Sequence, residues 1–447
     1  MTNGRRDGLL LLVLGSVVLI FLGAALGSAT GAGIVDFRSM YFSTRCLIQH
    51  GDPYTESAVF HLAQAEGGTR PWDSVGSRHI MQYIYLPTTF PVNAAFAVLP
   101  WGFASALWMA LSIGGLIFAS WLIWTAGAQS APDVSGILIG FLIGNAELLM
   151  VTGNAAGLAI SLCAVGVWCI FRERFVWAGM VCLAVSLAIK PQDAGLVWLY
   201  FALAGGVYRK RALQTLLLTF ALGLPGVVWV GSVAPQWRSE WHSAVQMLSA
   251  HAAMSDPGPA SAGAHGIGMM LGLQTVFSVF RDDPRFYDWA SYLICAPLLL
   301  LWIFITLLFR PTPKRTWLAL AAIAPLSMLI LYHRQIDALL LLLTVPACAQ
   351  LWAEGRRTGR IALPLTMAGF LVAGYLPWAI LLGLLSKLHL SGVLMLAAQA
   401  FPAPLTLLIL SIFYLWVYLR HCLARQKAEP HVARSGVVIR SSSVSEI

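Results

Sequence analysis

Charged residues are scarce in this 447-residue sequence: only 11% are Asp, Glu, Lys or Arg, while 58% are hydrophobic. A water-soluble protein with this balance would have too few polar groups to cover its surface. The composition therefore excludes an ordinary soluble enzyme and indicates that lipid surrounds much of the folded chain. The net charge of +9 does not indicate nucleic acid, because no basic stripe interleaved with aromatic residues is present.

Several catalytic and metal-binding motifs are absent as well. The sequence contains no HExxH, GxSxG or Walker A motif. No motif therefore supports a zinc protease, an α/β-hydrolase or a P-loop ATPase. The seven cysteines form no CxxC or Cys/His cluster. The sequence therefore predicts neither a metal site nor a cofactor.

Apolar runs of membrane length occur along most of the chain. A bilayer core needs about 20 helical residues, and about a dozen segments reach or approach that length. The expected fold is an all-α polytopic bundle of about 12 transmembrane helices in one domain, 1–419, followed by a cytoplasmic disordered tail, 420–447. The expected spans are 9–30, 103–125, 135–151, 155–171, 176–189, 193–208, 212–233, 288–309, 316–332, 335–352, 361–385 and 401–419.

The first apolar run has two interpretations. Arg5 and Arg6 precede the run Leu9 to Leu26, and small residues follow it, which is an order typical of a secretory signal. The run is about 18 residues long, however, which is longer than a typical signal core and long enough to span the hydrocarbon. A retained first membrane helix is the better interpretation.

The segment from Tyr83 to Pro100 decides the topology. It is apolar, but Pro87, Pro91 and Pro100 each remove a helix donor and disfavour helix at the preceding residue. If this segment is re-entrant or interfacial, every later cluster of Lys and Arg falls on the inside, as short cytoplasmic loops prefer. If it crosses, two of those clusters face outward. The first arrangement is therefore expected.

This topology places two long polar segments, 36–82 and 234–287, on the outside. The expected location is a bacterial inner (plasma) membrane, with the active site facing the periplasm or exterior. A charge at the bilayer centre costs about 3 kcal/mol or more, so ionisable groups near membrane depth need a wet cavity or a partner. In this chain they collect at outward helix ends.

Three of these ionisable residues are the main site candidates, and each also has a structural interpretation. Asp36 opens the first outer loop, as either a capping carboxylate or a catalytic base beside a lipid headgroup. Lys190 ends one span, where it either extends to the surface or binds a phosphate. His333 begins another span and shares a helical face with Asp337, four residues later. It is either a satisfied boundary histidine or a ligand of phosphate or sugar.

Weaker candidates accompany them. Asn154 follows Gly153 and is most simply a turn residue. Arg38 and Arg45 are spaced to share one helical face and could provide further phosphate contacts, although surface arginines are common.

Several short motifs of this sequence resemble those of a known protein family, and the resemblance covers most of residues 9–350. They are Asp36-Phe37 after one N-terminal span, Gly51-Asp52-Pro53-Tyr54, Tyr83-Ile84-Tyr85-Leu86-Pro87-Thr88, Gly153-Asn154, Ile189-Lys190-Pro191-Gln192 and Tyr332-His333-Arg334-Gln335-Ile336-Asp337. Together they resemble glycosyltransferase family 87, membrane enzymes of the GT-C class similar to polyprenyl-phosphate-mannose-dependent mannosyltransferases. The chain departs from the family pattern at Asn154, where glutamine is frequent, and at Thr88, where a second proline is frequent.

The resemblance implies a membrane glycosyltransferase that moves a hexose, with mannose expected, from a polyprenyl phosphate donor. The acceptor would be a hydroxyl of a glycolipid or glycan, with inversion and without a metal ion. Asp36 would be the general base. The expected donor phosphate ligands are Lys190, His333 and Arg38, and the expected substrate contacts are Tyr41, Asn154, Gln192, Arg334 and Asp337.

Two other classes of protein are possible from the residues alone. A transporter or flippase of a lipid-linked sugar would move its cargo without bond cleavage, but such proteins often carry repeats and discontinuous helices at the midplane. No clear repeat is found here, and the ionisable groups lie at the outer rim. A noncatalytic membrane scaffold would tolerate replacement of the candidate residues.

Overall fold

The computed structural model describes residues 3–30, 33–67, 82–260, 269–388 and 392–426. Within these residues the regular structure is helical, and one isolated antiparallel β-bridge pairs Met270 with Arg334. Parts of the predicted outer loops, 68–81 and 261–268, and most of the predicted tail, 427–447, lie outside the described residues. The last helix continues to Gln426, past the expected start of that tail.

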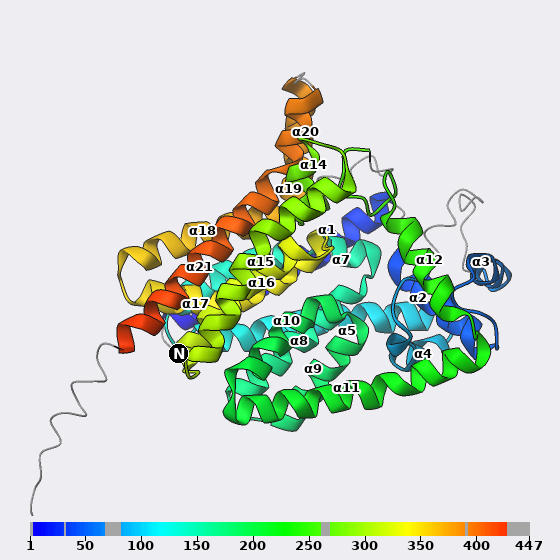
Figure 1. The fold of residues 1–447 in the computed structure, drawn as a ribbon, viewed down its shortest axis with the longest axis horizontal. Coiled ribbons are helices and arrows are strands. Elements are labelled where there is room, and N and C mark those ends of the chain that lie inside the picture. Colours follow the sequence, from blue (N-terminus) through cyan, green and yellow to red (C-terminus); the bar gives the residue numbers. More distant parts are fainter. Residues whose placement is uncertain (1–2, 31–32, 68–81, 261–268, 389–391, 427–447) are drawn as a thin grey trace, which may run out of the picture.

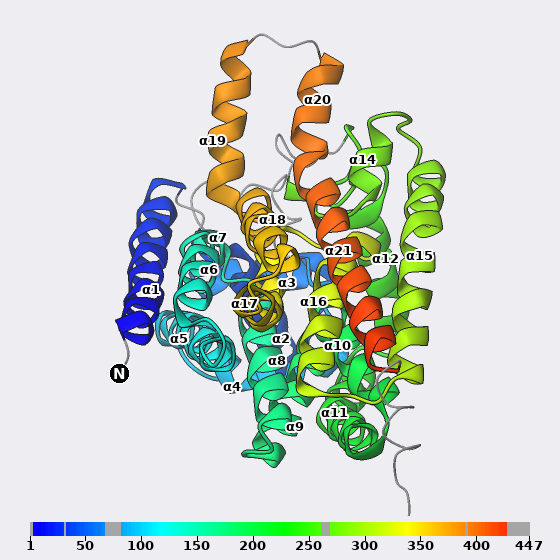
Figure 2. The same ribbon diagram turned by 90° about the vertical axis from the view of Figure 1, so that its left-hand side faces the viewer.

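Seven segments of the described chain are long and apolar enough to cross a membrane. They are α1 (Asn3–Thr30), α5 (Trp101–Gly127), α6 (Pro132–Gly144) with α7 (Glu147–Thr152), α11 (Gly206–Val233), α15 (Pro284–Leu308), η3 (Gln335–Thr344) with α17 (Val345–Ala353), and α20 (Gly392–Ala400) with α21 (Pro402–Gln426). An eighth is counted if α18 (Arg357–Ala373) and α19 (Tyr375–Leu385), which continues into η4 (Ser386–Leu388), form one span despite a 72° bend. Figure 2 shows α19 and α20 extending side by side beyond the other helices.

Shorter helices occupy the other predicted spans. These are α8 (Ala155–Phe171), α9 (Val176–Ile189), α10 (Pro191–Ala204) and α16 (Pro313–Ile330). A helix of 14 residues, the length of α9 and of α10, reaches about 21 Å, less than the roughly 30 Å hydrocarbon core. The prediction of about 12 spans is therefore not confirmed beyond the long helices, because α9 and α10 are two short helices that meet at Lys190.

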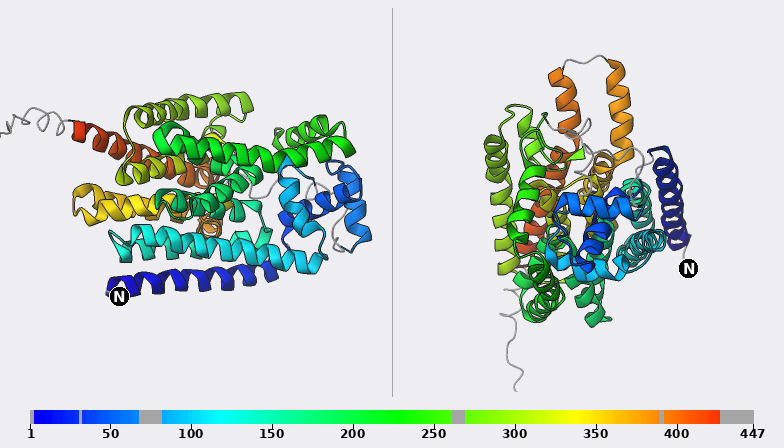
Figure 3. Two further views of the ribbon diagram at one scale, coloured as in Figure 1. Left: turned by 90° about the horizontal axis from the view of Figure 1, so that it is seen from below. Right: turned by 90° about the vertical axis from the view of Figure 1, so that its right-hand side faces the viewer.

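Small helices form a cap at one end of the long ones. They are α2 (Val35–Ile48), α3 (Glu56–Ala65), η2 (Pro87–Thr89), α4 (Phe90–Ala97), α12 (Trp237–Ser249) and α14 (Gln274–Ser278). Since α4 has eight residues, it reaches about 12 Å and is too short to cross a bilayer. Figure 3 shows α2, α3 and α4 at the opposite end of the molecule from the N-terminus.

Aromatic packing fixes this cap to the membrane helices. Phe37 on α2 stacks on Trp108 of α5, with ring centroids 4.6 Å apart and planes 15° apart. Phe96 on α4 meets the same tryptophan edge to face, at 5.2 Å between centroids. The three rings are buried, so the position of α2, and of Asp36 in its first turn, is set by the outer end of α5 (Figure 1).

The membrane helices α1 and α6 pack with their backbones in close contact. A Cβ atom on Gly15 would lie 2.3 Å from the carbonyl oxygen of Gly140, and one on Gly140 would lie 2.4 Å from the carbonyl oxygen of Leu11. Such backbone contact needs glycine on both helices, and it holds helices together where lipid removes the hydrophobic driving force.

We predict that Gly15→Ala destabilises the protein, by about 1–3 kcal/mol for an overpacked interface, because the methyl group must push α6 away. The midpoint of thermal unfolding in detergent checks this. Gly27→Ala is the matched control, since no atom lies within 4 Å of the added Cβ. Equal midpoints for the two variants would contradict the packing argument.

Candidate active site

Asp36 lies in the first turn of α2. The helix begins directly after Ile34, whose φ of 50° is left-handed. Its side chain is half-buried. Asn154 Nδ2 donates a hydrogen bond of 2.7 Å to Asp36 Oδ2. The first outer helix and the start of α8 therefore meet at this carboxylate.

The turn between α7 and α8 explains how Asn154 reaches Asp36. Gly153 has a φ of 63°, and a Cβ there would lie 3.0 Å from the Ile34 Cβ and 3.2 Å from the Phe37 Cβ. Its carbonyl oxygen accepts a 2.8 Å hydrogen bond from Trp108 Nε1. Asn154 Oδ1 in turn accepts from the Ala156 N–H at 2.9 Å and caps α8. The turn residue and the site residue are thus the same asparagine.

Lys190 is the centre of a second group of charges. It is buried at the junction of α9 and α10, where Pro191 begins the second helix. Its Nζ contacts Asp337 and lies 3.5 Å from Asp193 Oδ2. His333 Nε2 lies 3.3 Å from Asp193 Oδ1. Four ionisable side chains from α9–α10 and from the start of η3 therefore form one buried network.

Asp337 also determines where η3 begins. Its Oδ2 accepts a 2.8 Å hydrogen bond from the Arg334 N–H, while Oδ1 faces Lys190. The Arg334 guanidinium donates to the hydroxyl of Tyr332 and to the Met254 carbonyl oxygen at 3.2 Å. Unlike Lys190, the Arg334 side chain thus donates to neutral groups.

The charges of the two groups act on each other. Burial raises the pKa of Asp36 above its ordinary value, and the Asn154 hydrogen bond and the positive charges of Arg334 and Lys190 oppose that rise. Tyr85 interacts electrostatically with Asp36, Lys190 and Asp337. Asp36, Asn154, the Lys190 network and Arg334 therefore form one candidate site.

Three other predicted site residues lie on α2 and α10. The Tyr41 hydroxyl donates a 2.7 Å hydrogen bond to the Leu99 carbonyl oxygen, and its ring is buried against Trp101, so its polar atom is directed into the cap. Arg38 is buried on α2, two residues from Asp36 and therefore on another helical face. Gln192 is half-buried in the first turn of α10.

The sequence interpretation did not assign a role to Asp193, although the signal was present. Asp193 follows Lys190 by three residues, and Pro191 marks the start of a helix on which residues three apart are neighbours. Tyr85 was noted only as part of a motif, and its interaction with the charges of Asp36, Lys190 and Asp337 depends on how the cap packs.

Asp193, His333 and Asp337 each offer one ligand atom, and these atoms all lie within 4.8 Å of one another. Two carboxylates and an imidazole are ligands that a divalent cation accepts. However, the Lys190 ammonium already lies beside both carboxylates. The positive charge that a metal would supply is thus provided by Lys190, and these residues are better described as an ion-pair network.

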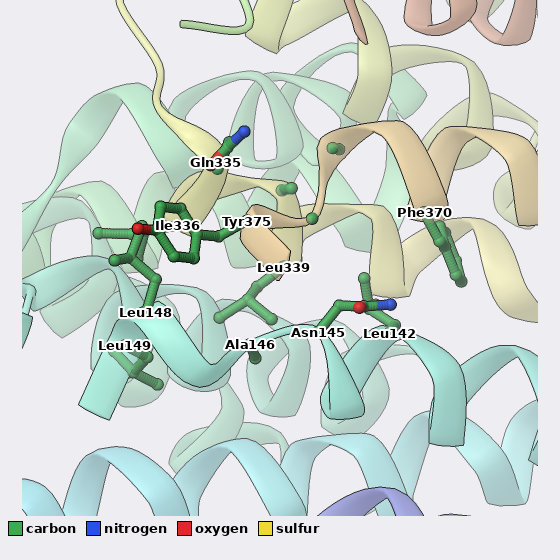
Figure 4. Close-up of a pocket in the computed structure, with 13 residues that line it drawn as sticks. Leu142, Asn145, Ala146, Leu148, Leu149, Gln335, Ile336, Leu339, Phe370 and Tyr375 are labelled. Atoms are coloured by element: carbon green, nitrogen blue, oxygen red, sulfur yellow. The ribbon is translucent and has the colours of Figure 1, made fainter. Parts of the chain in front are cut away.

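Two cavities adjoin the start of η3. One, lined by Gln335, Tyr375 and Asn145 among others (Figure 4), has a volume of about 10 Å³, which is room for a single water and not for a sugar. The other has a volume of about 420 Å³ and extends from His333 and Tyr332 between α12 and α15. The larger cavity connects the site with the outer end of a lipid-facing helix.

Helices of membrane length with a buried ionic site near one end define a multi-pass membrane protein with a charged, partly enclosed active site. The chain belongs to glycosyltransferase family 87, whose sequence profile matches residues 83–331. It is therefore an enzyme that transfers a sugar from a donor to an acceptor, and not a transporter or scaffold. The matched residues include Asn154, Lys190 and Asp193, while Asp36 and His333 lie outside them. Among curated proteins and solved structures, none matches this chain.

We predict that Lys190→Met destabilises the protein by about 3–5 kcal/mol, because it leaves two buried carboxylates without their cation. Thermal unfolding followed by tryptophan fluorescence measures the loss. Adding Asp337→Asn to the same chain should recover part of it.

The control for this loss is Lys314→Met at the opposite end of the bundle. Lys314 pairs with Glu354 at the surface, so its loss should change stability by less than about 1 kcal/mol. Equal destabilisation by Lys190→Met and Lys314→Met would show that the buried network does not support the fold.

Proposed function

We propose that Asp36 is the general base of a glycosyl transfer from a polyprenyl phosphate sugar to an acceptor hydroxyl. The observation that carries the proposal is the pairing of Asp36 with Asn154, a neutral donor, within reach of the charges of Lys190 and Arg334. The amide orients the carboxylate without neutralising it. The raised pKa also makes Asp36 a stronger base than a free aspartate, as long as it is ionised.

The proposed reaction is a single displacement. The acceptor oxygen attacks the anomeric carbon, and its proton passes to Asp36. The bond between that carbon and the phosphate oxygen breaks, so the configuration is inverted and polyprenyl phosphate leaves with the bonding electron pair. The negative charge of the leaving phosphate increases in this step, so cations fixed beside it lower the barrier.

Arg334 and Lys190 are the proposed cations, with His333 beside them. Arg334 donates to neutral oxygens, so its charge is available to a phosphate. Lys190 is shared with Asp193 and Asp337, and it would contribute mainly through its fixed position. The sequence interpretation gave Lys190, His333 and Arg38 as phosphate ligands. The contacts of Arg334 with neutral groups support its addition to that set.

The larger cavity is the proposed path of the donor. Its wall includes Leu248, Met270 and Tyr292, and Tyr292 and Leu293 on α15 are exposed on a membrane helix. An isoprenoid chain could lie in lipid beside α15 while its phosphate reaches His333 and Arg334. Apolar walls that lead to cations suit an amphipathic anion of this kind.

The remaining assignments follow from the resemblance and are proposed on that basis. They are a GT-C type of fold, mannose as the sugar, a glycolipid or glycan as the acceptor, and a periplasmic or exterior active site in a bacterial inner membrane. Asp36 lies on α2 in the cap, at one end of the membrane helices, which supports an acceptor that approaches from the aqueous side.

We predict that Asp36→Asn lowers the turnover of the purified enzyme by about 10²–10⁴-fold, the usual contribution of a general base. The measurement follows release of polyprenyl phosphate and transfer of labelled sugar in liposomes supplied with donor and acceptor. Folding should persist, because asparagine can still accept the Asn154 hydrogen bond.

Glu66→Gln provides the control for this loss. Glu66 is an exposed carboxylate of the same cap that pairs with Arg45, and its replacement should leave turnover unchanged. Near-normal turnover of a folded Asp36→Asn variant would remove Asp36 from the mechanism.

We also predict that turnover falls as the pH decreases through a midpoint above the ordinary aspartate value of 3.8, because burial raises the pKa of Asp36. Asn154 stabilises the ionised form, so Asn154→Ala should move this acidic limb to higher pH. Asn145→Ala is the control, since Asn145 donates to the Phe141 carbonyl oxygen within its own helix. A shift to lower pH in Asn154→Ala would contradict the proposed role of the hydrogen bond.

A further inference from the structure

A large groove opens at the end of the bundle opposite the active site. It has a volume of about 950 Å³ and lies along α5, α8 and α9, close to the first turn of α1. Asn154, which binds Asp36, caps the start of α8. Because α8 has 17 residues, its far end lies about 25 Å from the site. The groove therefore adjoins the other face of the membrane.

The charged residues that line the groove are at helix ends, and all of them are arginines. Arg172 and Arg174 follow α8, Arg5 lies in the first turn of α1, and Gln129 follows α5. Among the described residues that line the groove, none is acidic. The adjacent Glu173 pairs with Arg211, 3.3 Å away, and so does not neutralise the arginines of the groove.

The deeper wall of the groove is apolar and aromatic. Phe118 and Trp121 on α5 are exposed side chains of a membrane-spanning helix, and Trp168 on α8 donates a 3.0 Å hydrogen bond to Thr125. The hydrogen bond fixes the indole between α8 and α5. The groove thus combines cations at the membrane boundary with an apolar wall directed toward the bilayer core.

We propose that this groove is a binding site for an anionic glycerophospholipid of the leaflet opposite the active site. The phosphate lies among Arg5, Arg172 and Arg174, and an acyl chain lies along Phe118 and Trp121. Arginine binds phosphate oxygens through paired N–H donors, and tryptophan favours the headgroup boundary. Basic pockets between membrane helices are a known form of lipid headgroup site. A volume of 950 Å³ is at the upper end for ligand pockets.

The test measures lipid binding, and it does not depend on the transfer reaction. Delipidated protein is titrated with phosphatidylglycerol, and bound lipid is counted by native mass spectrometry. We expect the wild type to retain one phosphatidylglycerol in preference to phosphatidylcholine. Arg172→Gln with Arg174→Gln should weaken that binding by about tenfold or more, since contacts to charged groups are strong.

Arg356→Gln with Arg357→Gln is the matched control. It removes the same charge beside Glu354, on the same membrane face but outside the groove, and it should leave the binding unchanged. Equal losses in the two double variants, or equal binding of phosphatidylcholine, would overturn the proposal. Displacement of the lipid by glycerol phosphate alone would also overturn it, because it would indicate an ion site. Preferential displacement by polyprenyl phosphate would overturn it too, because it would indicate a donor or product site.

Discussion

The burial of the Lys190 charge is the constraint on which the site depends. An ammonium group inside a lipid-surrounded bundle is stable only with carboxylate partners, and Lys190 has two, Asp193 and Asp337. Asp193 belongs to α10, while Asp337 lies 147 residues from Lys190 in sequence. The ion pairs therefore fix the start of η3 against the α9–α10 junction. Any rearrangement of one segment would separate charges that lipid cannot solvate.

Asp337 extends this constraint to the backbone. One of its oxygens binds Lys190 and the other accepts the Arg334 N–H, so the same carboxylate pairs a charge and begins a helix. The helix that follows is a 3₁₀ segment of ten residues, longer than such segments usually are. The His333 carbonyl oxygen accepts a 3.0 Å hydrogen bond from the Leu271 N–H. The outer loop before α14 is thus bound to the ionic network through His333. Residues of both line the cavity of about 420 Å³ between α12 and α15.

The parts of this arrangement that the sequence predicted are those that depend on local spacing. Composition alone indicated a multi-pass helical protein, and the sequence placed Lys190 at the end of a span, where the structure has the junction of α9 and α10. The pairing of Lys190 with Asp337 was not predictable, because it joins segments whose proximity depends on the packing of the whole bundle. Tyr41 was an expected substrate contact by resemblance, but its ring packs on Trp101 and its hydroxyl donates to the Leu99 carbonyl oxygen. A motif position does not reveal the direction of a side chain.

The same contacts distinguish the three carboxylates of the site from one another. Asp193 and Asp337 lie beside the Lys190 cation and form ion pairs with it. Asp36 has a neutral amide as its hydrogen-bond partner, through one oxygen, and the cations act on it from a greater distance. Burial raises its pKa in spite of them. In the proposed mechanism Asp36 takes the proton of the acceptor hydroxyl, while the two paired carboxylates hold Lys190 in place.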